Sequence, residues 1–271
     1  MRLTRGHALS RAAGIGLAAL LTLAPTAAHA DGADRDNDSP NFSGGARISV
    51  RVAWWVLPFN DWRGTSPECT TGFGVHSKAD PGKTFLLTAA HCDVTGSWMT
   101  DGSGNFYTPG DKLVGAITDS RAQTDAALLQ APSGSEIYDG GTGAATFKKR
   151  VVGSAVPPIG ETVCLSGAKS GTSCGLEVIG TNRHETLGGH TFDGLTELRA
   201  PAGAVVAGPG DSGGPVFVLG SQPNTVLAVG TVSGGSVNND GVPVVADDGY
   251  QHIWIAPVRP ALDAFGVELN T

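Results

Sequence analysis

A serine between an acid and a run of glycines is the residue of this sequence best suited to nucleophilic chemistry. The segment Gly210–Pro215 (GDSGGP) can expose the Ser212 hydroxyl while neighbouring backbone N–H groups converge on one point. The segment Thr88–Cys92 (TAAHC) supplies His91, a candidate base because histidine titrates near neutral pH. Asp125 precedes an apolar run, and an acid at the start of a buried strand can orient an imidazole. Together these residues predict acyl transfer by a serine nucleophile.

Other acids and histidines compete for these roles. Asp119 is the alternative to Asp125, but its surroundings are typical of a solvated turn. The remaining histidines, among them His190 and His252, are interpreted as surface residues or as core residues with satisfied hydrogen bonds. His91 differs from them because it directly follows a β-prone run and adjoins Cys92, whose disulfide would fix the loop.

The chain order is histidine, aspartate, serine, whereas subtilisins run Asp, His, Ser and α/β-hydrolases run Ser, Asp, His. On these motifs the chain resembles the chymotrypsin-fold serine proteases, and within them the secreted bacterial streptogrisin and α-lytic protease type. The resemblance extends from about Ile48 to the C-terminus. It is supported by three further regions, which are Cys69–Phe73, Val163–Gly167 with Cys174-Gly175, and Ala256–Val258 with Ala264–Gly266.

The resemblance implies an all-β fold of two packed antiparallel β-barrels with a short C-terminal helix. His91 and Asp125 would come from a barrel over about 48–135 and Ser212 from a barrel over about 144–255, with the boundary near Ser133–Gly143. Composition agrees, because 40 glycines, 16 prolines and many short β-prone runs favour strands joined by turns. A helix is expected only over Arg259–Phe265, after Pro257.

All four cysteines lie after the first 30 residues, and four cysteines permit three pairings. The resemblance selects Cys69 with Cys92 and Cys164 with Cys174. It also assigns the oxyanion hole to the N–H groups of Gly210 and Ser212. We expect no metal and no organic cofactor, because the cysteines form no Cys-x-x-Cys pair and the triad needs neither.

The resemblance places the base of the substrate pocket at Val206 and its wall at Ser233, Gly234 and Gly235. Ser233 would also reach Asp125. Because no acid stands at the base, we expect apolar or small P1 side chains, with Asp247-Asp248 as the pair of acids that would favour Arg or Lys instead.

Asp211 lacks the partner that the resemblance implies. Relatives carry an arginine after the mid-chain half-cystine, whereas Leu165 follows Cys164 here. Two candidates remain for the positive charge. One is Lys169, which we favour, and the other is the amino group that a cut before Ile48 would create.

The first 30 residues are typical of a signal peptide. Arg2 and Arg5 precede an apolar run over Ala12–Leu23, and small residues lead to a cut after Ala30. The run is too short to span a membrane. Residues 31–47 are polar, so we expect a disordered leader or a short pro-segment, and the protease domain over 48–271.

Charge limits the partners of the exported chain. Three of the 18 basic residues and none of the 25 acidic ones lie in the first 30 residues, so the remainder is distinctly acidic. This argues against nucleic acid or membrane as partners and favours a soluble, secreted monomer. We expect a serine endopeptidase that acts on proteins or peptides, with a proteinaceous inhibitor as a further candidate partner. The alternatives are a catalytically silent binding protein on the same fold and an esterase that uses the same triad.

Overall fold

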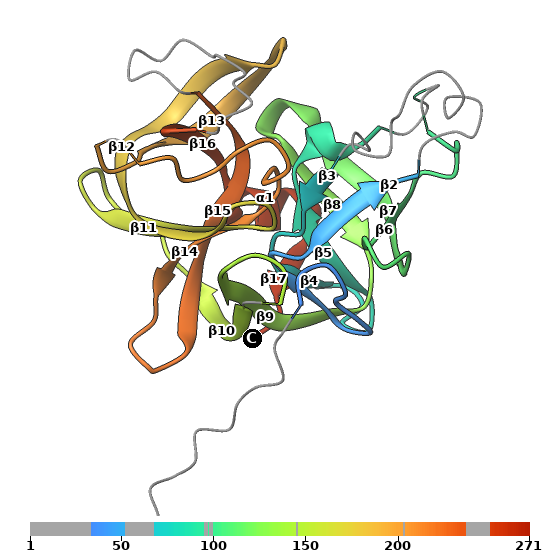
Figure 1. Ribbon diagram of the computed structural model, residues 1–271. Helices are drawn as coiled ribbons and strands as arrows, with labels where there is room; N and C mark the ends of the chain where they lie inside the picture. The colour runs from blue at the N-terminus through green and yellow to red at the C-terminus, as the bar shows by residue number, and fades with distance from the viewer. Residues whose placement is uncertain are drawn as a thin grey trace, which may run out of the picture.

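The computed structural model describes residues 34–51, 68–94, 97, 100–144, 146–202, 204–236 and 250–271. The expected signal peptide and Asp247-Asp248 lie outside these residues. Figure 1 shows two β-sheets side by side, with one short helix near the C-terminus. This is the expected all-β, two-barrel arrangement. No helix in the described residues is long and apolar enough to cross a membrane.

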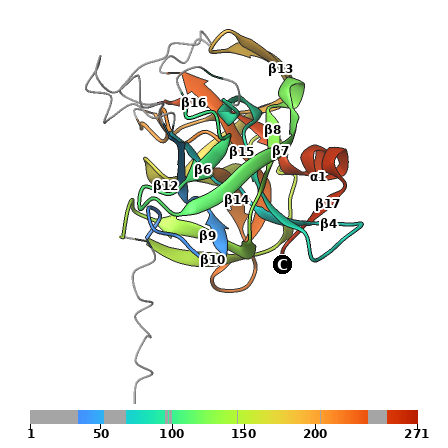
Figure 2. The ribbon, with the colours of Figure 1, turned by 90° about the vertical axis from the view of Figure 1, so that its right-hand side faces the viewer.

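The first sheet has eight strands in the order β17-β4-β5-β8-β7-β6-β2-β3, and all neighbours are antiparallel. Its strands are β2 (Arg47–Val50), β3 (Glu68–Thr70), β4 (Gly74–Ser77), β5 (Thr84–Thr88), β6 (Asn105–Tyr107), β7 (Leu113–Arg121), β8 (Ala126–Gln130) and β17 (Val267–Leu269). The C-terminal strand β17 thus returns to the N-terminal barrel, where it lies beside β4 (Figure 2).

The second sheet has nine strands in the order β1-β9-β10-β15-β14-β11-β12-β13-β16, and a further β15–β16 pairing closes part of it into a barrel. Its strands are β1 (Phe42–Gly44), β9 (Ser133–Gly140), β10 (Thr146–Ser154), β11 (Thr162–Gly167), β12 (Gly171–Leu187), β13 (His190–Arg199), β14 (Pro215–Leu219), β15 (Thr225–Ser236) and β16 (His252–Pro257). The pairs β1–β9 and β10–β15 are parallel. Ser133–Gly140, expected near the boundary, is a strand because its residues pair with β10.

The described residues form four clusters of buried side chains. The first fills the N-terminal barrel, the second fills the C-terminal barrel, the third packs between them, and the fourth joins β12 and β13 to β16. Strand β5 contributes Leu86 to the first and Phe85 and Leu87 to the third, so both of its faces are buried. Helix α1 (Val258–Phe265) packs on the third cluster and ends at Gly266, whose φ of 63° suits a helix C-cap. It starts within one residue of the expected helix.

The expectation of disorder over residues 31–47 is wrong for the part that the structure describes. Residues 42–44 form β1, and the Arg35 side chain is 0% exposed. Asp38 is also buried. Its carboxylate accepts the backbone N–H of Ser43, and its Oδ1 lies 3.1 Å from Nζ of Lys148. A polar composition predicted disorder, but these polar groups find fixed partners on the body of the protein.

Candidate active site

His91 lies in a 3₁₀ turn over Ala90–Cys92, directly after β5. The disulfide Cys69–Cys92 ties this turn to β3. The His91 side chain is 28% exposed. The second disulfide, Cys164–Cys174, joins β11 to β12. Both pairs are those that the resemblance implied.

Asp125 stands behind His91 and is 0% exposed. Asp125 directly follows a 3₁₀ turn, and its backbone is left-handed, with a φ of 51°. In this conformation the carboxylate points toward His91. Oδ1 accepts the backbone N–H of His91 at 2.9 Å, and Nδ1 of His91 lies 3.0 Å from Oδ1 and 2.9 Å from Oδ2. A carboxylate there places the ring proton on Nδ1 and leaves Nε2 free to act as a base. The alternative acid, Asp119, is exposed and pairs with Arg121 instead.

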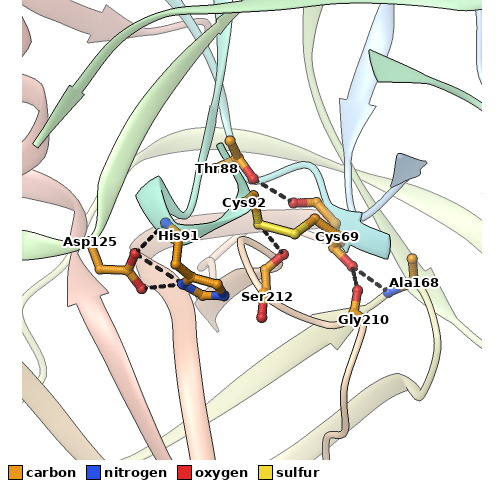
Figure 3. Close-up of a disulfide and its surroundings, with 9 residues drawn as sticks. Cys69, Thr88, His91, Cys92, Asp125, Ala168, Gly210 and Ser212 are labelled. Carbon is orange, nitrogen blue, oxygen red and sulfur yellow. Dashed lines mark hydrogen bonds and ion pairs between the residues drawn. A yellow bond between two sulfur atoms is a disulfide. The ribbon is translucent and has the colours of Figure 1, made fainter. Parts of the chain in front are cut away.

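Ser212 lies on the other side of His91, in the turn that precedes β14 (Figure 3). Both residues line one cleft. The structure records no hydrogen bond between the described atoms Nε2 of His91 and Oγ of Ser212. Catalytic hydrogen bonds are often long in enzymes without substrate, so this arrangement remains compatible with a serine–histidine pair.

The backbone around Ser212 leaves two donors free. The N–H groups of Asp211, Gly213 and Gly214 donate to the carbonyls of Gly208, Val232 and Asp211, at 3.1, 2.7 and 2.9 Å. Within the described residues, the N–H groups of Gly210 and Ser212 have no protein acceptor. These are the two donors that the sequence assigned to the oxyanion hole.

Thr70 of β3 is a functional residue that the sequence analysis missed. Its backbone N–H donates to the Ser212 carbonyl at 2.7 Å, and its hydroxyl donates to the Gly210 carbonyl at 2.8 Å. The same hydroxyl accepts the N–H of Ala168 at 3.1 Å. Thr70 therefore joins the N-terminal barrel to the loop that carries the nucleophile. A hydroxyl residue directly after the half-cystine Cys69 was the available signal.

The packing around Thr70 explains why Gly213 must be glycine. The φ of Gly213 is 85°, and a Cβ on this residue would lie 2.2 Å from Thr88 Oγ1 and 2.4 Å from the Thr70 carbonyl. Any side chain would push the nucleophile loop away from β3.

Asp211 is fully buried, and its partners differ from those expected. Oδ1 accepts the backbone N–H groups of Lys169 at 2.9 Å and Ser170 at 3.1 Å, and Oδ2 accepts that of Gly208 at 2.8 Å. Lys169 thus contributes its amide, and no ion pair to its ammonium is present among the described residues. Ile48, the other candidate, is buried within β2 opposite Cys69.

The cleft beside the triad has a volume of about 240 Å³. Its described lining residues are His91, Leu187, Gly188, His190, Phe192, Ser212, Ser233, Gly234, Gly235 and Tyr250. Ser233, Gly234 and Gly235, which the resemblance implied as the pocket wall, are among them. The Ser233 hydroxyl is buried and has no hydrogen-bond partner among the described residues, so it does not reach Asp125.

Val206 does not line the cleft. It is 3% exposed and belongs to the core of the C-terminal barrel, whereas the preceding Val205 points to solvent. Tyr250 lines the cleft instead, and its carbonyl accepts the N–H of Val206. Burial raises the pKa of Tyr250, and the charge of Asp211 raises it further, so its hydroxyl remains protonated at neutral pH.

The hairpin formed by β12 and β13 lies beside His91, which the sequence analysis did not predict. The ring of Phe192 lies 6.4 Å from that of His91, and His190 stacks on Phe192 at 6.3 Å. These three residues also line a second hollow of about 460 Å³ on the other side of His91, next to Ala122 and Gln123. His190 and Phe192 of the hairpin therefore line both hollows.

The described residues contain no group of three or more His, Cys, Asp or Glu side chains with the spacing of a metal site.

Comparisons with known proteins agree with this fold. Streptogrisin-C of Streptomyces griseus is 30% identical over 214 residues, which cover 76% of this chain and 39% of that protein. This chain thus spans less than half of the length of that relative. The structures of the Nocardiopsis protease NAPase and of a Cellulomonas bogoriensis chymotrypsin are 24% and 23% identical, each with a TM-score of 0.58 over 86% of this chain and 100% of the other. They share its fold.

A family model described as Trypsin matches residues 71–251. Because this match covers more than half of the 271 residues, the chain belongs to the trypsin family.

Proposed function

We propose that this protein is a secreted serine endopeptidase that cleaves peptide bonds through an acyl-enzyme on Ser212. The observation that carries the proposal is the His91–Asp125 pair, with Nδ1 of His91 2.9 Å from Oδ2, in the same cleft as Ser212. The N–H groups of Gly210 and Ser212, the latter in the cleft, have no acceptor among the described residues. This combination is what acyl transfer requires.

In the first half of the reaction, Oγ of Ser212 bonds to the carbonyl carbon of the substrate while Nε2 of His91 takes the hydroxyl proton. The negative charge on the substrate oxygen is stabilised by the N–H groups of Gly210 and Ser212. His91 then gives its proton to the leaving amine as the C–N bond breaks. In the second half, water attacks the ester carbon while His91 takes a proton from the water. His91 then gives this proton to Oγ of Ser212 as the ester bond breaks, and the acid product leaves.

We further propose a broad preference for apolar or small P1 side chains. None of the described lining residues of the cleft is Asp, Glu, Lys or Arg, and Leu187, Phe192 and Tyr250 present apolar surface. A charged P1 group would lose hydration there without meeting an opposite charge. Apolar residues that differ by one methylene should differ by only about 1–3 kcal/mol, so the selectivity is graded.

Export and the partners follow from the same reasoning. The N-terminal pattern of residues 1–30 and the two disulfides support secretion. The substrates would be proteins or peptides, and the enzyme would act as a monomer, with a proteinaceous inhibitor as a further partner.

A P1-varied peptide library tests this proposal, with Ser212→Ala as the blank. We expect cleavage after Leu, Phe, Met or Ala and little after Arg, Lys or Glu. Cleavage mainly after Arg or Lys would contradict the apolar pocket and point to Asp247-Asp248. Hydrolysis of esters but of no peptide amide would favour an esterase, and no hydrolysis of either would favour a binding protein.

A further inference from the structure

Arg35 is a fully buried cation in the N-terminal segment Asp34–Gly45. Its Nε donates to the carbonyl of Gly141, Nη1 to the carbonyl of Gly45 and Nη2 to Oγ of Ser166, each at 2.9 Å. Its guanidinium also lies 5.5 Å from the centre of the Tyr138 ring. One side chain thus joins the N-terminal segment to the loop after β9 and to β11.

The position of Arg35 connects it with Asp211 beneath the oxyanion hole. Ser166, which receives Nη2, is followed by Gly167, where a Cβ would lie 2.0 Å from Asp211 Oδ1. Gly167 must be glycine because the carboxylate occupies this space. The guanidinium therefore contacts one residue of β11, and the carboxylate packs against the next.

The charges point to the same pairing. Burial lowers the pKa of Arg35 to about 10, and among the charges that oppose this shift Asp211 acts most strongly, ahead of Asp139. Asp139 has its own partner, Lys149, at 2.9 Å. Asp211 forms no ion pair within 4.0 Å among the described residues, so Arg35 is the buried cation available to balance its charge.

We propose that Asp34–Gly45 is a permanent part of the active site and that Arg35 is a positioning residue, which balances Asp211 and so keeps the Gly210 and Ser212 N–H groups aimed at the substrate. This inference rests on the proposed function. Asp211 links the two donors, and its carboxylate anchors the loop through three backbone N–H groups. An uncompensated buried charge on Asp211 would favour movement of that loop. Processing after Arg47 would consequently yield an inactive enzyme.

The experiment compares Arg35→Met, Arg35→Lys and Lys148→Met in the full chain. Lys148 is the matched control, because it anchors the same segment through Asp38 at 3.1 Å and, among the described residues, no hydrogen bond or ion pair joins it to the Asp211 loop. We expect Arg35→Met to lower kcat about 100-fold, the effect of losing an oxyanion donor, with little change in KM. Arg35→Lys should recover part of the loss, and added ethylguanidinium should raise the kcat of Arg35→Met. Lys148→Met should keep the wild-type kcat.

A folded Arg35→Met enzyme with wild-type kcat would overturn the proposal. So would an equal loss of kcat in Lys148→Met, because the segment would then act only as a structural staple. If Arg35→Met does not fold, the double variant Arg35→Met/Asp211→Asn decides. It should fold better than Arg35→Met if the two charges balance each other, and no improvement would overturn the pairing.

A measurement that does not need activity separates this proposal from the proposed function. In ¹H–¹⁵N spectra, Arg35→Met should shift the amide signals of Gly210 and Ser212, while Lys148→Met should leave them in place. If Arg35→Met shifts these signals but the wild-type protein hydrolyses no peptide, the proposed function alone is refuted. Unchanged amide signals in an active enzyme would refute the role of Arg35 alone.

Discussion

Thr70 and Gly210 are joined across the two barrels by a hydrogen bond of 2.8 Å, from the threonine hydroxyl to the glycine carbonyl. The backbone N–H of Thr70 holds the Ser212 carbonyl at the same time. Both carbonyls are thereby turned toward β3, and in the described part of the chain the N–H groups of the same two residues have no acceptor. The N-terminal barrel thus supplies His91 and Asp125 and also orients the loop that carries the nucleophile.

Thr70→Val, which removes the hydroxyl but keeps the shape, should lower kcat about tenfold. The change leaves the Gly210 carbonyl and the Ala168 N–H without their partner, at a cost of about 1–3 kcal/mol. Part of that cost falls on the oxyanion loop, so kcat should change more than KM. Thr70→Ser is the matched control and should retain most of the activity. Wild-type kinetics in Thr70→Val would show that the loop holds its shape without this hydroxyl.

Asp125→Asn should lower kcat by about 10⁴-fold, because an amide does not hold the His91 tautomer that frees Nε2. Adding Ser212→Ala should cost little more, since the triad acts as a unit. Asp119→Asn is the matched control, and it should keep wild-type activity because Asp119 is exposed and pairs with Arg121. Steady-state kinetics on a peptide anilide give the kcat of the single and double variants. If the fold losses of the two single variants multiplied in the double variant, the triad would not act as a unit.

The motifs around His91, Asp125 and Ser212 could be found from sequence because each is local. A few consecutive residues form the turn or strand start that each side chain needs, and the chain order then indicates the fold. The apolar run of β5 and the proline before α1 are equally local.

The misjudged features depend on contacts between distant residues. Counting back from Ser212 reaches Val206 but does not tell which side of the backbone it faces, and it faces the barrel core. Arg35 lies in a segment whose composition is typical of disorder, yet its acceptors lie more than 100 residues away at Gly141 and Ser166. The reach of the β12–β13 hairpin over His91 likewise depends on tertiary packing.

The two disulfides should affect catalysis differently. Replacing Cys69 and Cys92 with Ala, or Cys164 and Cys174 with Ala, should lower the free energy of unfolding by about 3 kcal/mol in each case. Only the first pair should also lower kcat, because Cys92 directly follows His91 and Cys69 precedes Thr70. Urea unfolding and kinetics below the unfolding range measure the two effects. Equal kcat in both double variants would contradict a positioning role for Cys69–Cys92.

Stability should fall as the pH falls, through His252 of β16. Burial lowers its pKa from the ordinary 6.5, although the charge of Glu197 opposes the shift. The unfolded chain then binds a proton at a pH where the folded protein does not, so folding weakens as the pH drops from about 6.5 toward the lowered value. His252→Phe should therefore reduce the loss of unfolding free energy between about pH 7 and pH 5. An unchanged pH dependence in this variant would contradict the assignment.

Labelling with a fluorophosphonate, followed by peptide mapping, tests the central claim most directly. The reagent phosphonylates a serine only where a base activates it and an oxyanion hole receives the developing charge. We predict one adduct, on Ser212, which is absent from Ser212→Ala and strongly slowed in His91→Ala. A folded wild-type protein that remains unlabelled, or that carries its adduct on another serine, would contradict the catalytic role assigned to Ser212.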